Sequence, residues 1–163
     1  MRVGIGFDVH RFAEGRRLVL AGVEFEGATG LEGHSDADVV THAVIDALLG
    51  AAGLGDIGRH FPDSEERWRD ASSMEMLAAV RRMLEDENYQ VVNLDVAVVA
   101  ERPQLAANVE SMREKVAAAL RIGPRFVSIK ATTAEGLGAL GRSEGIGAWA
   151  VVLIDRMRSP ELP

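Results

Sequence analysis

Apolar residues alternate with small or polar residues along the first ten positions of the chain, which is the period of a β-strand. The apolar residues of one face, predicted to form a core face, are Val3, Ile5, Phe7 and Val9. The opposite face carries Gly4 and Gly6 and then Asp8 and His10. The carboxylate and the imidazole are therefore expected to point the same way, beside open space left by the glycines.

A period typical of a helix predicts a second element over about 38–52. Its apolar residues are Val39, Val40, Ala43, Val44, Ala47, Leu48 and Ala51. Ser35 and Asp38 resemble a capping box at its start, and Gly53 and Gly55 follow its end. His42 is then expected one turn into the helix, beside its apolar stripe.

The rest of the chain interleaves strand and helix signals. Ser72 and Glu75 form the capping-box pattern of a second helix, and Pro103 is expected in the first turn of a third. The remaining strands are expected at 18–20, 23–25, 91–100, 126–131 and 147–154.

These elements predict an α+β fold over residues 1–157, a single-domain two-layer sandwich. It has a mixed four-stranded sheet with helices on one face, plus a small hairpin. Oligomerisation is expected to cover the other face of the sheet. Residues 158–163 are expected to form a flexible tail.

Composition narrows the function. The chain has 163 residues, of which 47% are hydrophobic and 26% charged, as in an ordinary globular protein. Its net charge of -7 and its 5% aromatic content argue against nucleic acid or an anionic membrane as a partner. No apolar run has the length of a membrane span, and the N-terminus lacks a signal-peptide pattern. Cysteine is absent, which excludes thiolate ligands and fits a cytoplasmic location.

Asp8, His10 and His42 could bind a metal through nitrogen and oxygen atoms. An Asp and two His leave one position open, the arrangement of catalytic zinc. The alternative stays open on spacing alone: His42 as an ordinary half-buried helix histidine and Asp8 as a surface charge.

Two further segments have the residue types of ligand loops. Thr132 and Thr133 can offer hydroxyl and N–H groups to phosphate oxygens, and Glu135 can bind a hard cation such as magnesium. Asp56 and Asp63 flank a glycine-bearing loop and could bind hydroxyl groups. The plain alternatives are a helix N-cap in the first segment and a turn with solvated carboxylates in the second.

Other polar and aromatic residues have simpler interpretations. Arg142 and Glu144 can pair with each other or bind an anion, while Trp68 and Trp149 are assigned to packing and His60 to the surface. The chain has no P-loop, no Gly-x-Ser-x-Gly elbow and no dinucleotide fingerprint. Metal ligands, threonines and glycine loops together favour phosphoryl chemistry.

Six blocks of the sequence, in order and with matching spacing, resemble the 2-C-methyl-D-erythritol 2,4-cyclodiphosphate synthase family. The blocks are Gly6-Phe7-Asp8-Val9-His10, His34-Ser35-Asp36, Asp46-Ala47-Leu48-Leu49-Gly50, Gly55-Asp56-Ile57-Gly58 with Phe61-Pro62-Asp63, Lys130-Ala131-Thr132-Thr133, and Gly141-Arg142-x-Glu144-Gly145. No single block is decisive, but together they are highly specific.

The resemblance implies a lyase of the non-mevalonate isoprenoid pathway. Such an enzyme converts 4-diphosphocytidyl-2-C-methyl-D-erythritol 2-phosphate to the 2,4-cyclodiphosphate and releases CMP. It implies zinc at Asp8, His10 and His42, and magnesium or manganese with Glu135 and the substrate diphosphate. It also implies a cytoplasmic homotrimer packed through its sheets, with sites between subunits and room for an isoprenoid diphosphate in a central cavity.

The same resemblance assigns roles by position. His34 and Thr133 are implied as catalytic residues that hold the reacting phosphates. Further implied substrate contacts are Ser35, Asp56, Ile57, Gly58, Phe61, Pro62, Asp63, Ser64, Glu65, Ala100, Glu101, Arg102, Pro103, Gln104, Leu105, Ala106, Thr132, Ala134, Ala139 and Arg142. Residues 100–106 are expected to form the cytosine pocket, and residues 61–65 to line the methylerythritol phosphate side.

The chain departs from the family pattern at four positions: Gln104, where lysine is common, Ala134, Gly136 and Ala139. These changes predict weaker substrate binding at most. Two alternatives share the same ligands: a metal-dependent hydrolase of nucleotide diphosphates, and a non-catalytic trimer that binds an isoprenoid diphosphate. A structural zinc normally has four protein ligands, whereas three are found here, which favours catalysis.

Overall fold

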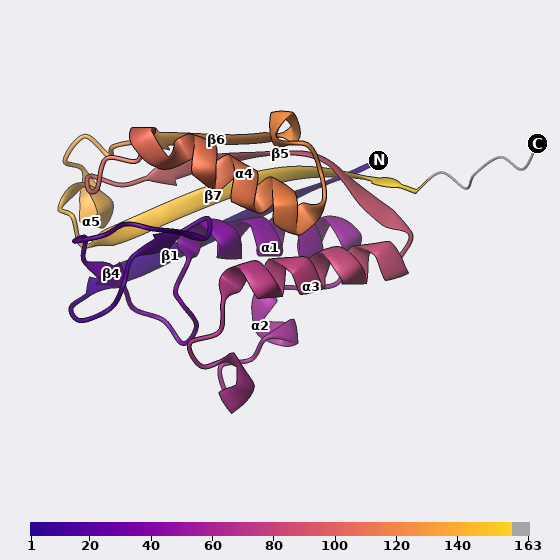
Figure 1. Cartoon of the computed structure of the whole chain (residues 1–163), viewed down its shortest axis with the longest axis horizontal. Helices are drawn as coiled ribbons and strands as arrows, with labels where there is room; N and C mark the ends of the chain where they lie inside the picture. Colours follow the sequence, from indigo (N-terminus) through magenta and orange to yellow (C-terminus); the bar gives the residue numbers. More distant parts are fainter. Residues whose placement is uncertain (158–163) are drawn as a thin grey trace, which may run out of the picture.

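The computed structural model describes residues 1–157 and is built on one mixed sheet (Figure 1). The strands lie in the order β4 (Gly30–Leu31), β1 (Arg2–Ala13), β7 (Gly145–Arg156), β5 (Tyr89–Val99) and β6 (Val127–Thr132). β5 and β6 are parallel, and the other neighbours are antiparallel. The predicted sheet has four strands, so β4 is an addition. It pairs only two residues with the end of β1, too few to leave a periodic signal.

Helices cover one face of this sheet, as predicted. α1 (Val39–Ala52), α3 (Ser73–Asp86) and α4 (Val109–Leu120) pack together on that side (Figure 1). α1 lies against β1 and β7 and is covered in turn by α3, which explains why almost its whole circumference is buried. The expected hairpin is β2 (Val19–Leu20) with β3 (Val23–Glu24).

Short elements complete the part of the chain that the structure describes. They are α2 (Ile57–His60), α5 (Gly138–Gly141) and the single 3₁₀ turns η1 (Glu66–Trp68), η2 (Ala106–Asn108) and η3 (Pro124–Phe126). No helix within residues 1–157 combines the length and the apolar character that crossing a membrane requires. The predicted flexible tail, 158–163, lies outside the described residues.

The two faces of β1 are the reverse of the prediction. The glycine face is the buried one: a Cβ on Gly4 would lie 1.9 Å from the carbonyl oxygen of Ala47, and one on Gly6 would lie 2.0 Å from that of Ala43. The main chain of α1 therefore fills the space that was expected to be open. Val3 and Ile5, on the predicted core face, are 67% and 70% exposed. Period-two alternation separates two faces but does not say which one a helix covers.

Helix starts also differ from the predicted capping boxes. Asp38, rather than Ser35, is the N-cap of α1, and its carboxylate accepts from Thr41 N at 3.0 Å. Ser72 is the N-cap of α3 as expected, but its side chain makes no capping hydrogen bond. α4 begins at Val109, after η2, so Pro103 lies in the preceding loop rather than in its first turn. Gly53 ends α1 as predicted, with a φ of 78°.

Candidate metal centre and substrate cleft

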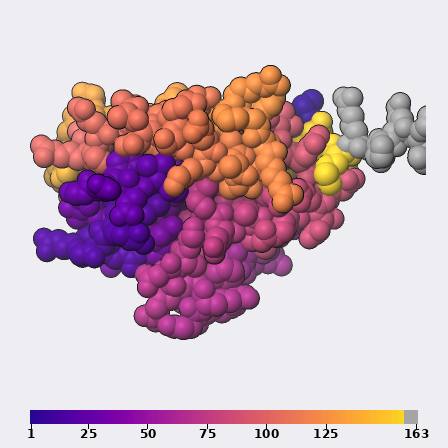
Figure 2. Space-filling model, viewed as in Figure 1, coloured from indigo at the N-terminus to yellow at the C-terminus, as the bar shows by residue number. Residues whose placement is uncertain are grey.

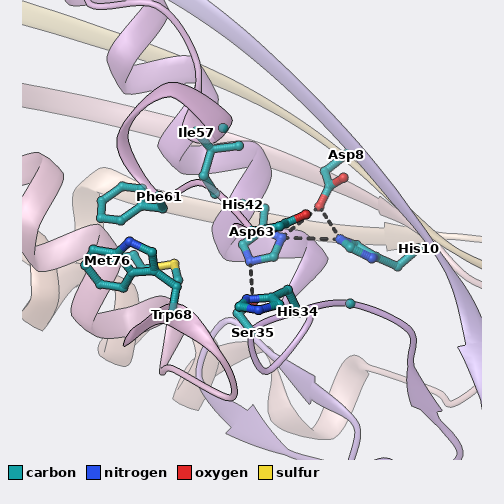
Figure 3. A pocket seen from close by; sticks show the side chains of 12 residues that line it. Asp8, His10, His34, Ser35, His42, Ile57, Phe61, Asp63, Trp68 and Met76 are labelled. Carbon is teal, nitrogen blue, oxygen red and sulfur yellow. Dashed lines mark hydrogen bonds and ion pairs between the residues drawn. The ribbon is translucent and has the colours of Figure 1, made fainter. Parts of the chain in front are cut away.

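Three predicted metal ligands converge at one point of the fold. Asp8 and His10 leave the same side of β1, and His42 reaches them from the first turns of α1 (Figure 3). Asp8 Oδ2 lies 2.9 Å from His10 Nε2 and 3.1 Å from His42 Nδ1, and the two ring nitrogens are 3.3 Å apart. All three ligand atoms are within 4.8 Å of one another. Two nitrogens and one oxygen at this spacing suit a divalent metal, which supports the metal interpretation over isolated surface groups.

The charges of this cluster are already arranged for a cation. Burial opposes ionisation of Asp8, but hydrogen bonds to His10 and His42 outweigh it and hold the pKa of the Asp8 carboxyl well below its usual range. Burial also acts to lower the pKa of His10, but the hydrogen bond to Asp8, its charge and the Glu32 carbonyl raise it. The cluster therefore keeps an anionic oxygen at neutral pH beside His10, whose proton competes with a bound metal.

Groups outside the cluster contact the second ring nitrogen of each histidine ligand. His10 Nδ1 lies 2.5 Å from the carbonyl oxygen of Glu32. His42 Nε2 lies 3.1 Å from Ser35 Oγ and 2.9 Å from Ser73 Oγ. Such outer contacts fix ring orientation in metal sites. Ser73 has no predicted role, because its position at the start of α3 is far from His42 along the chain.

A cavity of about 270 Å³ lies beside the cluster. Its lining residues are Asp8, His10, Gly33, His34, Ser35, His42, Ile57, Gly58, Phe61, Asp63, Trp68 and Met76. Nine of these are predicted site residues, so this part of the prediction assembles in one place. Asp56, Pro62, Ser64 and Glu65 are outside the lining; Asp56 instead caps α2 by accepting from Arg59 N at 3.0 Å.

The sequence prediction missed Gly33, Trp68 and Met76 in this lining. Trp68 packs edge-on against Phe61, with the ring centroids 4.9 Å apart, so its assignment to packing is correct but incomplete. The segment that carries Trp68 projects from the lower edge of the molecule in Figure 2. Asp46, which has no predicted role, accepts from Ile57 N at 2.7 Å and so ties α2 to α1. Burial raises the pKa of Asp46, with charge from Asp56 and Asp8 adding to it.

Most of the other predicted residues form a second group at the ends of β5 and β6 and in the segments that follow these strands. The two strands are parallel, with Val99 opposite Thr132, so the loops leave the sheet side by side. Ala100 N donates to Thr132 O at 3.0 Å, and Glu101 Oε1 accepts from Ala134 N at 2.9 Å. These contacts join the predicted cytosine loop to the predicted threonine loop.

This second group does not line the metal-site cavity. Glu101, Arg102, Pro103 and Gln104 border a separate, open groove of about 870 Å³, whose other wall includes residues 26–29. Thr133 Oγ1 donates to Glu135 Oε1 at 2.6 Å, and both residues are exposed. Neither is a helix N-cap, since α5 begins at Gly138.

Two smaller interpretations are also resolved. Arg142 Nε pairs with Glu144 Oε1 at 2.7 Å, and both side chains are largely exposed. Trp149 packs against Phe7 in a tilted arrangement, with the ring centroids 4.6 Å apart, but it lies on the uncovered face of the sheet and remains partly exposed.

Fold and site together define a class: a small α+β metalloenzyme whose three-ligand centre opens on a substrate cleft. Residues 1–155 match the model of the YgbB family, and the chain belongs to that family.

Named relatives agree with this assignment. The 2-C-methyl-D-erythritol 2,4-cyclodiphosphate synthase of Symbiobacterium thermophilum is 56% identical over 154 residues, which cover 94% of this chain and 98% of that protein. The bifunctional IspDF of Campylobacter jejuni is 40% identical with a TM-score of 0.92, over 96% of this chain but 42% of that one. IspF of Plasmodium falciparum, solved as a CDP complex, is 29% identical with a TM-score of 0.84, covering 96% and 97%.

Proposed function

We propose that this chain is a 2-C-methyl-D-erythritol 2,4-cyclodiphosphate synthase. It converts 4-diphosphocytidyl-2-C-methyl-D-erythritol 2-phosphate to the cyclic diphosphate, with release of CMP. The observation that carries the proposal is the convergence of Asp8, His10 and His42 at the edge of a cleft, in a chain that belongs to this family.

In this reaction the substrate supplies its own nucleophile. An oxygen of the 2-phosphate forms a bond to the β-phosphorus, the bond from the β-phosphorus to the bridging oxygen breaks, and CMP leaves with that oxygen. No protein nucleophile is needed, which suits a chain without cysteine. Folding the substrate so that its two phosphates meet makes the step intramolecular, worth on the order of 7–11 kcal/mol.

Asp8, His10 and His42 would hold zinc, and Glu135 would hold magnesium or manganese with the diphosphate. These ions would supply Lewis-acid polarisation of phosphate oxygens and orientation of the reacting groups. His34 and Ser35, which line the cleft, bind the phosphate beside the metal site. Ile57, Gly58, Phe61 and Asp63 shape the side that receives the methylerythritol.

The second group of residues completes the site from a neighbouring subunit. Thr132 and Thr133 donate to the diphosphate, while residues 100–106 receive the cytosine largely through backbone groups. The separation of this group from the metal-site cavity within one chain supports a site built between two copies. Arg142 and Ala139 then lie toward the shared axis, where an isoprenoid diphosphate could bind in a central cavity.

A homotrimer packed through its sheets fits the uncovered face. That face exposes Val3, Ile5, Phe7, Val9, Trp149 and Val151. A contiguous apolar patch of this kind marks an interaction surface. We include in the proposal a single catalytic domain over 1–157 and a cytoplasmic location, as suits an enzyme that acts on a small phosphorylated substrate.

Phosphorus NMR of the purified protein with the diphosphocytidyl substrate, zinc and magnesium tests the proposal. We expect the coupled signals of a cyclic diphosphate together with CMP, and their loss in His42→Ala. His60→Ala is the matched control, because His60 contacts the carbonyl of Leu54 and lies outside the ligand cluster. A linear phosphate product would indicate a hydrolase, and unchanged substrate would indicate a binding protein.

A further inference from the structure

The ring nitrogen of His42 that faces away from the ligand cluster lies between two serine hydroxyls. Nδ1 points to Asp8 Oδ2, so Nε2 is the nitrogen left for the surrounding protein. Ser73 Oγ lies 2.9 Å from Nε2, and Ser35 Oγ lies 3.1 Å from it. A histidine that binds a metal through Nδ1 carries its proton on Nε2, and that N–H requires an acceptor.

Ser73 is hydrogen-bonded to the carboxylate of Asp36. Its hydroxyl donates to Asp36 Oδ1, and its backbone N–H donates to Asp36 Oδ2 at 3.0 Å. Since the hydroxyl hydrogen is committed to Asp36, a lone pair of Ser73 Oγ is left to face His42. Ser73 is fully buried, so water does not compete for this hydroxyl.

Asp36 is itself held in place. Its Oδ1 accepts from Asp38 N at 3.3 Å, and its own N–H donates to the carbonyl of Ala71 at 3.1 Å. Asp38 is the N-cap of α1, the helix that carries His42, and Ala71 lies just before α3. The carboxylate therefore joins the starts of the two helices whose side chains meet at Nε2.

Ser35 differs in this respect. Its Oγ accepts from Ala37 N at 3.2 Å, and among the described residues no carboxylate accepts from its hydroxyl. Ser35 also lines the cleft, whereas Ser73 does not. The hydroxyl hydrogen of Ser35 is thus free to turn toward a bound phosphate, while that of Ser73 is not.

We propose that Asp36 and Ser73 form a hydrogen-bonded chain that keeps the proton of His42 on Nε2 and presents Nδ1 to the metal. Both are positioning residues, since neither touches the metal or the cleft. The inference rests on the metal site of the proposed function and adds the residues that determine which nitrogen binds. Removing an outer partner of this kind typically weakens metal affinity by about 10- to 100-fold.

Zinc affinity measured by competition with a chromophoric chelator tests this directly. We expect Ser73→Ala to bind zinc about 10- to 100-fold more weakly than the parent, and Ser73→Thr, which keeps the hydroxyl, to recover most of the loss. Ser72→Ala is the matched control: it removes the neighbouring hydroxyl, which makes no capping hydrogen bond, and should leave zinc affinity unchanged.

A second readout follows the proton itself. Two-bond ¹H–¹⁵N spectra of protein labelled at histidine report which ring nitrogen is protonated. All samples are compared in the metal-free state, because zinc at Nδ1 would itself keep the proton on Nε2. We expect the Nε2–H form of His42 to predominate in the parent and in Ser72→Ala, and a mixture of both forms in Ser73→Ala. A purely structural role for Ser73 would lower the melting temperature without altering the His42 tautomer.

The two proposals fail in different ways. Zinc binding that survives in His42→Ala would overturn the metal site itself. Tight binding in the parent that depends on His42, with unchanged affinity in a folded Ser73→Ala, would overturn the role of Ser73. If Ser73→Ala does not fold, Asp36→Asn takes its place. In that variant a several-fold weaker affinity supports the chain, and an unchanged affinity rejects it.

Discussion

The two halves of the predicted site are built differently. The residues of the metal half belong to β1 and α1, their side chains are mostly buried, and both histidine ligands contact hydrogen-bonding groups outside the cluster. The threonine half lies at the end of β6 and on the loops after β5 and β6, and Thr132, Thr133 and Glu135 are all exposed. A single chain therefore supplies the whole ligand cluster, whereas it leaves the threonine residues exposed on its surface.

This contrast explains what each half can do alone. A metal ligand set needs positions fixed to a fraction of an ångström, which regular elements supply. Donors to a flexible diphosphate tolerate loop positions, provided that another surface closes over them. The first half is therefore expected to bind zinc in any folded chain, and the second to act only where two copies meet.

The largest effect is expected from removing a metal ligand. His42→Ala should lower kcat about a thousandfold or more, because the metal contributes several kcal/mol to stabilising the transition state. Bound zinc, measured on the purified protein, should be lost with it. Retention of zinc at full stoichiometry alongside normal turnover would remove His42 from the site.

Thr133→Ala should have the next largest effect, on the other half. Loss of one preorganised donor to the reacting phosphates is expected to lower kcat by about 100-fold. Zinc content should stay that of the parent, since Thr133 does not line the metal-site cavity. A steady-state assay beside metal analysis checks both points, and zinc loss in this variant would contradict the division into halves.

Acidification should weaken zinc binding by the metal half. The pKa of His10 is raised, so its proton competes with zinc to a higher pH than that of an unperturbed histidine. Asp8, whose pKa lies below the usual range, stays ionised throughout this window. Below the pKa of His10, zinc affinity should fall by roughly tenfold or more per pH unit.

Chelator competition between about pH 7.5 and about pH 5.5 measures this slope. In the metal-free protein the raised pKa of His10 affects the stability of the fold instead, and it does so in the opposite direction. A raised His10 pKa stabilises the fold at low pH, and this contribution is lost as the pH rises through that pKa. A zinc affinity that does not change with pH would exclude imidazole ligands.

Only part of the metal half was predictable from the spacing of its residues. Period two places Asp8 with His10, whereas spacing alone left the role of His42 open and only the resemblance to the family joined it to the pair. The same periodicity failed to say which face of β1 is buried, since that depends on the close approach of α1 to Gly4 and Gly6. Ser73 could not be found in this way, because only the tertiary packing of α3 on α1 brings it to His42.

The threonine half was recognised by resemblance rather than by periodicity. Its residues follow strands β5 and β6 as predicted, but the link from Glu101 to Ala134 N depends on loop conformation. β4 and the position of Pro103 escaped prediction for a related reason: short pairings and loops are set by neighbours, not by local pattern.

Mixing two inactive variants, one with each half of the site damaged, should restore part of the activity. The proposed trimer predicts this outcome when His42→Ala and Thr133→Ala are unfolded together in equal amounts and refolded. If each site takes its metal half from one subunit and its threonine half from the next, random assembly leaves both halves intact in about a quarter of sites. Activity no higher than that of the separate variants would show that each chain builds its own site.

The smallest effect is expected at Gln104, at the rim of the groove beside Glu101. Gln104→Lys adds a positive charge to a chain of net charge -7, near the expected position of the nucleotide. An exposed charge contributes at most about 1 kcal/mol, so KM should fall by about two- to fivefold with kcat unchanged. Gln104→Met, similar in length but uncharged, should leave KM near that of the parent. Equal KM values in all three proteins would place Gln104 away from the nucleotide and confine recognition in this half to the backbone.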